Sequence, residues 1–187
     1  MKHWTSLTIV AVVILFGCSR VEDPTSIPID QIIAVRVTGP NPIVADGSAM
    51  TTLEAMIPAE ATGTNRTVKF TTTRGSFQGT DGKQEVSVTV DAQGIARATL
   101  IAGRDPAIAN VSATAGTYTS SVPVTLTRAY ATSIQAETNS ASVSQDGKTK
   151  PTITAILSRA VGQVSPNTPV TFQAFQARSD GSRCFNI

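Results

Sequence analysis

Histidine is almost absent from this sequence, since His3 is the only one among 187 residues. It lies in an N-terminal segment that we expect to be removed, which leaves a mature chain without histidine. Such a chain cannot build a Ser-His-Asp or Cys-His nucleophile, nor a zinc site with histidine ligands. Carboxylate-pair and Ser-Lys chemistry pass this test, but no residue pattern points to either. We therefore predict that the protein is not an enzyme and uses no cofactor.

Cysteine and charge are scarce as well. Cys18 and Cys184 lie at opposite ends of the chain and are too few for a disulfide framework or an all-cysteine metal site. Charged residues make up 15% of the chain, against about 25% in an average soluble domain. The net charge of +2 gives no basic surface of the kind that nucleic acids bind. The sequence thus predicts neither a metal site nor a nucleic-acid partner.

Threonine and serine are plentiful instead, with 27 and 17 residues. Hydrophobic residues make up 41% of the chain, which is enough to build a core, although only 5% of the residues are aromatic. Short runs rich in threonine, valine and alanine, separated by glycine, favour β-strands. The composition therefore predicts an all-β protein.

The first residues have the pattern of a secretory signal. Residues 7–16 form a near-apolar run of ten residues, a length typical of a signal-peptide core and too short to span a bilayer. The run ends in Leu15-Phe16-Gly17-Cys18, which resembles the bacterial lipobox, although Phe16 stands where that motif usually has a small residue. The resemblance implies that diacylglycerol is attached to the Cys18 thiol and that cleavage follows Gly17. The alternative is an ordinary secretory signal with an incidental cysteine at its end.

The segment after this cysteine is predicted to be a tether. Residues 18–30 contain two prolines and no periodic apolar pattern. A flexible stretch of about a dozen residues reaches at most about 40 Å. Ser19 stands where an aspartate would favour retention in the inner membrane, so the resemblance implies an outer-membrane location. We therefore assign residues 1–17 to a lipoprotein signal peptide and residues 18–30 to the lipidated cysteine and its flexible tether.

Residues 31–127 alternate between apolar and polar side chains in short runs. Turn-forming residues such as Asp46-Gly47 and Asp91-Ala92-Gln93-Gly94 recur about every ten residues. Seven or eight short strands in just under a hundred residues are typical of an Ig-like antiparallel β-sandwich. The predicted strands lie at residues 32–37, 43–44, 53–57, 68–70, 86–90, 96–100, 109–115 and 122–126.

The chain also contains an internal repeat. Residues of the first strands recur with an offset of 100, and a later triplet recurs with an offset of 102. The pairs are Asp46-Gly47 with Asp146-Gly147, Leu53 with Ile153, Ala55 with Ala155, Ile57 with Leu157, and Val68-Lys69-Phe70 with Val170-Thr171-Phe172. Such self-similarity is typical of tandem modules. We expect a second, incomplete Ig-like module over residues 132–187 that stops soon after its third strand.

The motifs of the first copy are distinctive. Residues 44–55 begin Val-Ala-Asp-Gly-Ser-Ala, residues 68–77 read Val-Lys-Phe-Thr-Thr-Thr-Arg-Gly-Ser-Phe, and residues 90–100 contain Asp-x-x-Gly-x-Ala-x-x-x-Leu. Together with residues 109–115, these stretches resemble the bacterial Ig-like domain, group 1, found in invasin and intimin stalks. The resemblance covers nearly all of residues 31–127. It implies an Ig-like sandwich that serves as a spacer, because most modules of this family are spacers that carry another part of the protein.

Isolated charged residues offer no site of their own. The aspartates that precede predicted turns are Asp46, Asp81, Asp91 and Asp146. A calcium loop needs several oxygen ligands that converge within a few residues, so we expect these carboxylates to bond to their own turns instead. Four cations are expected to be solvated surface charges, because they do not cluster: Lys69, Lys83, Arg97 and Arg104.

These observations predict a lipid-anchored cell-envelope protein whose Ig-like modules have a structural or cell-adhesion role. Its expected partners are the membrane, through the lipid on Cys18, and a protein or glycan at the cell surface. The alternative is a module that faces the periplasm and binds a glycan or a partner protein through the loops of the sandwich. Accessibility to protease on intact cells separates the two.

Overall fold

The structure is a computed structural model of the chain, and it describes residues 33–58, 66–140, 148, 150–173, 175–177 and 183–185. Within these residues every regular element is a β-strand. All the strand pairs among them are antiparallel except one. The all-β class predicted from composition is therefore confirmed.

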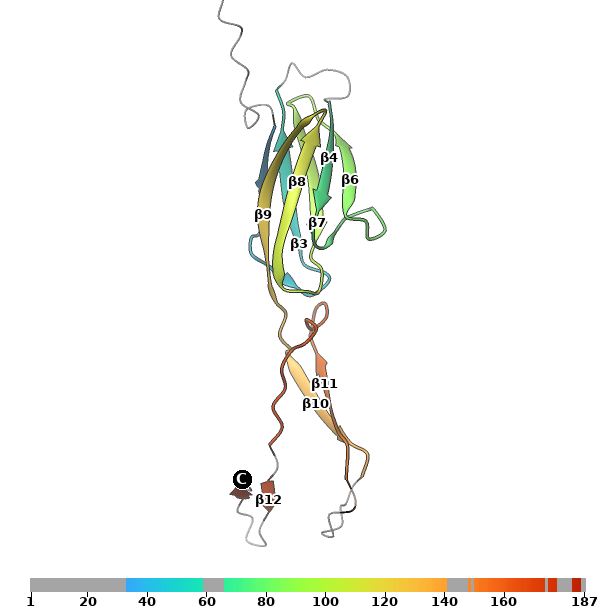
Figure 1. Cartoon of the computed structure of the whole chain (residues 1–187), viewed down its shortest axis with the longest axis vertical. Coiled ribbons are helices and arrows are strands. Elements are labelled where there is room, and N and C mark those ends of the chain that lie inside the picture. The colour runs from blue at the N-terminus through green and yellow to red at the C-terminus, as the bar shows by residue number, and fades with distance from the viewer. Residues whose placement is uncertain are drawn as a thin grey trace, which may run out of the picture.

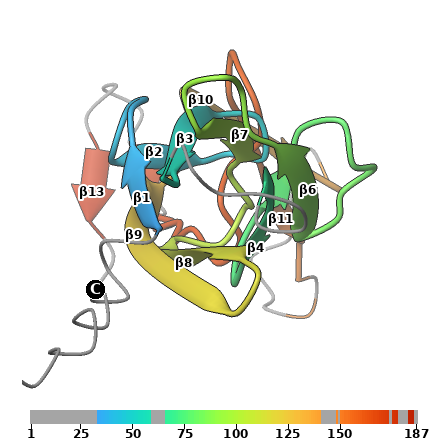
Figure 2. The same cartoon turned by 90° about the horizontal axis from the view of Figure 1, so that it is seen from above.

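The first nine strands form two sheets that face each other (Figures 1 and 2). The four-stranded sheet contains, in spatial order, β1 (Ala34–Val37), β3 (Met50–Met56), β7 (Ile95–Ile101) and β5 (Ser76–Phe77). The five-stranded sheet contains, in spatial order, β2 (Ile43–Ala45), β9 (Tyr118–Arg128), β8 (Ala107–Ala115), β4 (Thr67–Thr72) and β6 (Glu85–Thr89). The described residues from 33 to 129 thus form a two-layered β-structure.

Alternation in the sequence explains which side of each strand is buried. In β3, Thr51, Leu53 and Ala55 are buried, whereas Met50 and Met56 at its two ends are exposed. Successive side chains of a strand point to opposite faces, so every second residue meets the other sheet. The same alternation of burial runs along β4, β7 and β8.

A single core lies between the two sheets. Leu53 and Leu100 come from the four-stranded sheet, and Val111 and Val124 from the five-stranded sheet, and all four are fully buried. The largest buried side chains are those of Phe70 and Phe77, whose ring centroids lie 6.2 Å apart with the planes tilted by 54°. This separation is within the favourable range for aromatic pairs. The core therefore joins both sheets, which is the packing of a β-sandwich.

The chain enters and leaves the sandwich at opposite ends (Figure 1). Ala34 begins β1 and pairs with Met56, the last residue of β3. Arg128 ends β9 and pairs with Ala45 in the one parallel strand pair, and Ala45 precedes the turn into Met50 at the other end of β3. β9 has 11 residues, and a strand of that length spans about 35 Å. The sandwich thus separates its two chain connections by its own length.

The strands of residues 31–127 lie where the sequence predicts them. Each predicted run overlaps a strand of the structure, and the turn at Gly75 precedes β5, a two-residue strand that was not predicted. β5 pairs only with the end of β7, through Ser76–Ile101 and Phe77–Leu100. Two residues are too few to leave a periodic pattern in the sequence.

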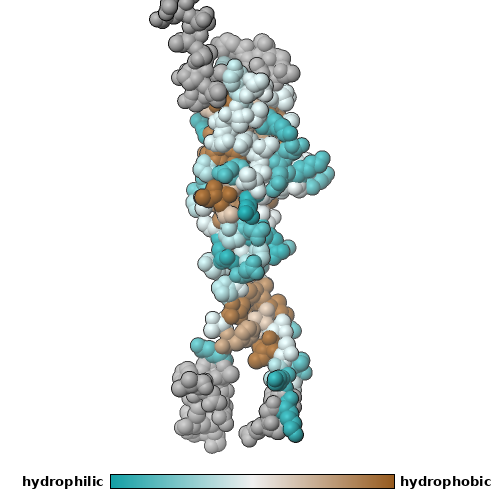
Figure 3. Space-filling model, viewed as in Figure 1, coloured by the Kyte–Doolittle hydropathy of each residue, from teal (hydrophilic) through white to brown (hydrophobic). Residues whose placement is uncertain are grey.

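Two further strand pairs follow the sandwich. β10 (Ser133–Thr138) pairs antiparallel with β11 (Ile153–Ser158), and β12 (Phe175–Ala177) pairs with β13 (Arg183–Phe185), where Cys184 lies. One face of the β10–β11 pair carries Ile134 opposite Leu157 and Ala136 opposite Ala155. Large apolar side chains are exposed on and beside this pair (Figure 3): Tyr130, Ile134, Ile153, Ile156, Val161 and Phe172.

One predicted strand of the repeat is wrong. Residues 170–172, expected to repeat the strand at Phe70, form no strand, and 55% of Phe172 is exposed. In the first copy, β4 lies between β6 and β8, and Phe70 pairs with Val86 on one side and Ala113 on the other. Among the described residues no strand pairs with residues 170–172, so this segment lacks the two neighbouring strands that β4 has in the first copy.

Candidate functional site

The predicted site residues at the N-terminus lie outside the described residues. Cys18, expected to carry the lipid, and Gly17, expected to precede the cleavage point, both fall there, and so does Asp146 of the repeat. The lipidation of Cys18 and the cleavage after Gly17 therefore remain predictions from the sequence.

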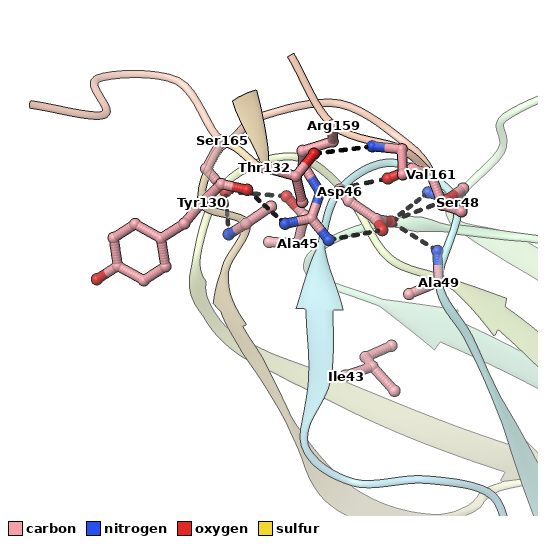
Figure 4. A network of polar contacts seen from close by, with 12 residues as sticks. Ile43, Ala45, Asp46, Ser48, Ala49, Tyr130, Thr132, Arg159, Val161 and Ser165 are labelled. Atoms are coloured by element: carbon pink, nitrogen blue, oxygen red, sulfur yellow. Dashed lines mark hydrogen bonds and ion pairs between the residues drawn. The ribbon is translucent and has the colours of Figure 1, made fainter. Parts of the chain in front are cut away.

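A group of polar contacts joins the end of the sandwich to residues 159–168, which follow β11 (Figure 4). We call this group the joint. On the sandwich side it contains Ala45, Asp46, Arg104, Arg128 and Ala129; on the other side it contains Arg159, Gly162, Gln163, Val164, Ser165 and Pro166. The joint lies at the end of the sandwich where the chain leaves it.

Ser165 is the buried centre of the joint. Only 3% of this residue is exposed, and its hydroxyl donates to the Ala45 carbonyl at 2.9 Å and accepts from the Ala129 N–H at 2.9 Å. The Ser165 N–H also donates to the Ala129 carbonyl at 3.0 Å. The hydroxyl and the N–H of Ser165 thus both bond to backbone groups of the sandwich, as buried polar groups require.

Asp46 closes the turn between β2 and β3. Its Oδ1 accepts hydrogen bonds from the backbone N–H groups of Ser48 and Ala49, both at 2.8 Å, and from the Ser48 hydroxyl at 3.0 Å. Burial by itself raises the pKa of Asp46, but these bonds and the nearby charge of Arg159 lower it below its ordinary value. The carboxylate is therefore ionised at neutral pH, with Oδ2 at 3.9 Å from Arg159 Nη2.

Three arginines bind backbone carbonyls at the joint. Arg104 donates to the Val164 carbonyl at 3.1 Å, and Arg128 donates to the Pro166 carbonyl at 3.0 Å. Arg159 donates to the carbonyls of Tyr130 and Val161, one on the connecting segment and one on its own. Arg104 is exposed, as predicted, and its guanidinium also bonds to the segment after β11, which was not predicted.

Two other sequence predictions concern turn aspartates. In the turn after β6, Asp91 Oδ1 accepts from the N–H groups of Gln93 and Ile95, both at 2.9 Å, as expected for a carboxylate that bonds to its own turn. Asp81 has a left-handed backbone with φ of 53°, a conformation that aspartate tolerates better than most residues. The carboxylates of Asp46 and Asp91 thus bond to their own turns as predicted, and Asp81 lies in a turn with a left-handed backbone.

Charge on the outer face of the four-stranded sheet is arranged in a ladder. Glu54 on β3 accepts from Arg36 Nη2 at 2.7 Å and from Arg97 Nε at 2.9 Å, and Arg97 also reaches Asp91 at 3.1 Å. The hydrogen bond from Arg36, followed by that from Arg97, lowers the pKa of Glu54. The ladder connects β1, β3 and β7, and its charges are already satisfied by one another.

A hollow of about 330 Å³ opens at the side of the sandwich. Its lining includes Phe77 from β5, Val86 and Val88 from β6, and Arg97 from β7. Arg97 is the one charged residue of the lining, and it is bound to Glu54 and Asp91.

No group of three or more metal-ligating residues occurs among the described residues. In the same part of the chain, no helix is long and apolar enough to cross a membrane.

Comparison with known proteins gives no identification. A scan of the chain against protein-family models found no match. A search of curated proteins found no match either.

The joint was not predicted from the sequence. Asp46 was singled out for its turn and as part of the repeat, and Arg159, Gly162 and Ser165 were not singled out at all. Most of its bonds run from a side chain or an N–H to a backbone carbonyl, and every residue type supplies that acceptor. The one signal available was the polar, glycine-containing stretch after Leu157, which departs from strand alternation.

Proposed function

We propose that the protein is a lipid-anchored spacer of the bacterial cell envelope, built from Ig-like modules arranged end to end. The observation that carries this proposal is the position of the two chain connections at opposite ends of the sandwich. A module connected in this way adds its full length, about 35 Å for an eleven-residue strand, to the distance between its two neighbours in the chain. Such a geometry suits a stalk that supports cell adhesion.

The strand order supports the Ig-like part of the proposal. In Ig-like sandwiches, one sheet has the order A-B-E-D and the other contains C, F and G. The order β1-β3-β7-β5 corresponds to A-B-E-D, and β9-β8-β4 corresponds to G-F-C. β2 and β6 extend the second sheet at its two edges, and β2 does so in parallel with β9.

The second strand pair supports tandem modules. In the first copy, β1 pairs antiparallel with β3, and Val35 lies opposite Ala55 on the inward face. β10 and β11 form the same kind of pair, with Ile134 opposite Leu157 on an apolar face. The pair β10–β11 is therefore proposed to be the start of a second Ig-like module.

The anchor in this proposal is Cys18. Residues 18–30 would connect the membrane to the start of β1, at the end of the sandwich opposite the joint. A tether that reaches at most about 40 Å would keep the first module near the membrane. β10 and β11 would then lie farther out than the sandwich.

The test is protease treatment of intact cells that carry the full chain, with an antibody against the sandwich as readout. We expect protease to cut the tether and release the sandwich into the medium, while a soluble periplasmic protein of the same cells stays intact. In cells with the Cys18→Ala substitution, the sandwich should not be released from the surface and should not incorporate a palmitate analogue. The unaltered chain is the positive control and should incorporate the palmitate analogue.

Two outcomes would contradict the proposal. Equal palmitate label in the unaltered chain and in Cys18→Ala would exclude Cys18 as the anchor. If protease releases no sandwich from intact cells and does so only after the outer membrane is opened, the result would support the periplasm-facing alternative instead of an outward spacer.

A further inference from the structure

We propose that residues 159–168 are a latch: they bind the end of the sandwich through Ser165, Gly162 and Arg159 and hold the β10–β11 pair in one direction relative to it. The inference concerns the purified chain and does not depend on the cellular function proposed above. Its basis is the geometry of the joint.

A second attachment is what distinguishes a latch from a linker. The chain passes from Arg128 at the end of β9 to Ser133 at the start of β10 through four intervening residues, and a single connection of this kind leaves the next unit free to turn. Residues 159–168 return from β11 to the same end of the sandwich and bind it separately. Two attachments on different segments fix the direction of the β10–β11 pair relative to the sandwich, which a single attachment leaves free to change.

The contacts of Ser165 in the joint are buried and paired. Ser165 is 3% exposed and Ala129 has no exposed surface, and they exchange two hydrogen bonds, from Ser165 N–H to Ala129 O and from Ala129 N–H to Ser165 Oγ. The Ser165 hydroxyl makes a third bond, to the Ala45 carbonyl 120 residues earlier in the chain. Removing this hydroxyl would leave buried backbone groups without a partner, which is costly.

Gly162 marks the closest approach of the two segments. Its φ is +69°, and a Cβ placed on it would lie 2.6 Å from Asp46 Cγ and 2.8 Å from the Asp46 carbonyl oxygen. The next residue, Gln163, donates its N–H to that same carbonyl at 2.8 Å. Only a residue without a side chain both adopts this backbone conformation and admits this contact. The segment therefore fits the sandwich end closely and leaves no room for a larger residue.

The internal repeat indicates that the two halves of the latch belong to different modules. Asp46-Gly47, which receives the latch, recurs in the second copy as Asp146-Gly147. Arg159, which approaches Asp46, has alanine at the corresponding place of the first copy, residue 59. The cation is thus present in the copy that follows a module and absent from the copy that follows the tether. This distribution is expected if the arginine serves contact with a preceding module.

The test is amide hydrogen exchange, measured by mass spectrometry on the full chain. In the unaltered chain, the N–H groups of Ala129 and Gln163 should exchange at least about tenfold more slowly than amides of an open loop, because both are bonded within the joint. Ser165→Ala should accelerate exchange at Ala129 and Gln163 about tenfold, since two hydrogen bonds are lost. Gly162→Val should raise these rates at least as far, because its side chain collides with Asp46.

Val161→Ala is the matched control. Val161 lies in the same segment but is 69% exposed, and its backbone carbonyl, which accepts from Arg159, is kept by the substitution. Exchange at Ala129 and Gln163 should therefore be unchanged in this variant. Amides in the middle of β8 should stay slow in every variant, which shows that the sandwich itself remains folded.

If Ser165→Ala also accelerates exchange in β8, Arg159→Gln distinguishes opening of the latch from unfolding of the sandwich. This substitution removes the charge at 3.9 Å from Asp46, on a side chain that is 18% exposed, together with the hydrogen bonds from Arg159 to the carbonyls of Tyr130 and Val161. It leaves the buried contacts of Ser165 in place. We expect a several-fold faster exchange at Gln163, most marked at low salt. Open-loop exchange at Ala129 and Gln163 in the unaltered chain would overturn the latch. Equal rates at these amides in the unaltered chain, Gly162→Val and Arg159→Gln would do the same.

Discussion

Glu54 illustrates how single residues stabilise an exposed face of the sandwich. Its side chain is 12% exposed and lies between Arg36 on β1 and Arg97 on β7. Isolated surface ion pairs contribute little to stability, but a carboxylate shared by two arginines is a small network with bonds to two neighbouring strands. The pair formed by Lys69 and Glu85 is simpler, since both side chains are more than half exposed.

The Glu54 ladder gives a prediction on pH. The hydrogen bonds from Arg36 and Arg97 lower the pKa of Glu54 below its ordinary value of 4.5, so Glu54 contributes stability above that value and loses it as the pH falls through the lowered pKa. Glu54→Gln should therefore lower the thermal midpoint at pH 7 and have little effect at pH 2. Thermal unfolding followed by circular dichroism at both values measures this.

Glu85→Gln is the control for the same experiment. Its carboxylate pairs with Lys69 in a single exposed contact, so its effect at pH 7 should be smaller than that of Glu54→Gln. Added salt should reduce both effects. An equal loss of midpoint from Glu54→Gln at pH 7 and pH 2 would mean that the ion pairs are not the cause.

At the scale of the strand, burial by the opposite sheet determines the cost of a substitution. Phe70 on β4 and Leu100 on β7 are fully buried and belong to one core, although they come from different sheets. Phe70→Ala should cost about 3–5 kcal/mol and Leu100→Ala about 2–5 kcal/mol of the free energy of unfolding. Denaturant unfolding of the full chain measures both changes.

Ile108 on β8 provides the matched control, since 59% of it is exposed. Ile108→Ala should cost less than about 1 kcal/mol, because the site loses little buried surface. Similar losses for Phe70→Ala and Ile108→Ala would mean that the two sheets do not share the core described above.

The strands also show what the sequence can and cannot predict. Alternation located the strands of the sandwich because each has one face against the other sheet, as in β3 and β8. β5 was not predicted because it has only two residues. Residues 170–172 were wrongly predicted to be a strand, because the sequence similarity to β4 does not include the strands that flank β4. A strand depends on its neighbours as much as on its own residues.

The joint was beyond prediction for a different reason. Ser165 and Ala45 are separated by 120 residues, and their contact is a hydroxyl to a carbonyl. Neither residue type signals a partner, and the contact exists only because β2 and the segment after β11 meet at one end of the sandwich. The tether and the anchor, in contrast, were predicted from local motifs and remain predictions.

At the scale of the whole molecule, the proposed spacer depends on the separation of the two chain connections of the sandwich. β1 begins at the end of the sandwich where β3 finishes, and β9 finishes at the opposite end, beside Ala45. A spacer requires this arrangement, because a module whose connections lay side by side would add almost nothing to the reach of a stalk. The latch would then hold the next unit, which begins with the β10–β11 pair, in one direction relative to the sandwich.

Single-molecule stretching of the full chain, held by its two ends, measures this separation. About 97 residues, from 33 to 129, unfold together if the sandwich is one cooperative unit, and extended they measure about 340 Å. Because the folded sandwich already spans about 35 Å between its connections, we expect the sandwich to unfold in one event with a gain of about 300 Å. A gain close to the full extended length would place the two connections side by side. That result would contradict the spacer geometry.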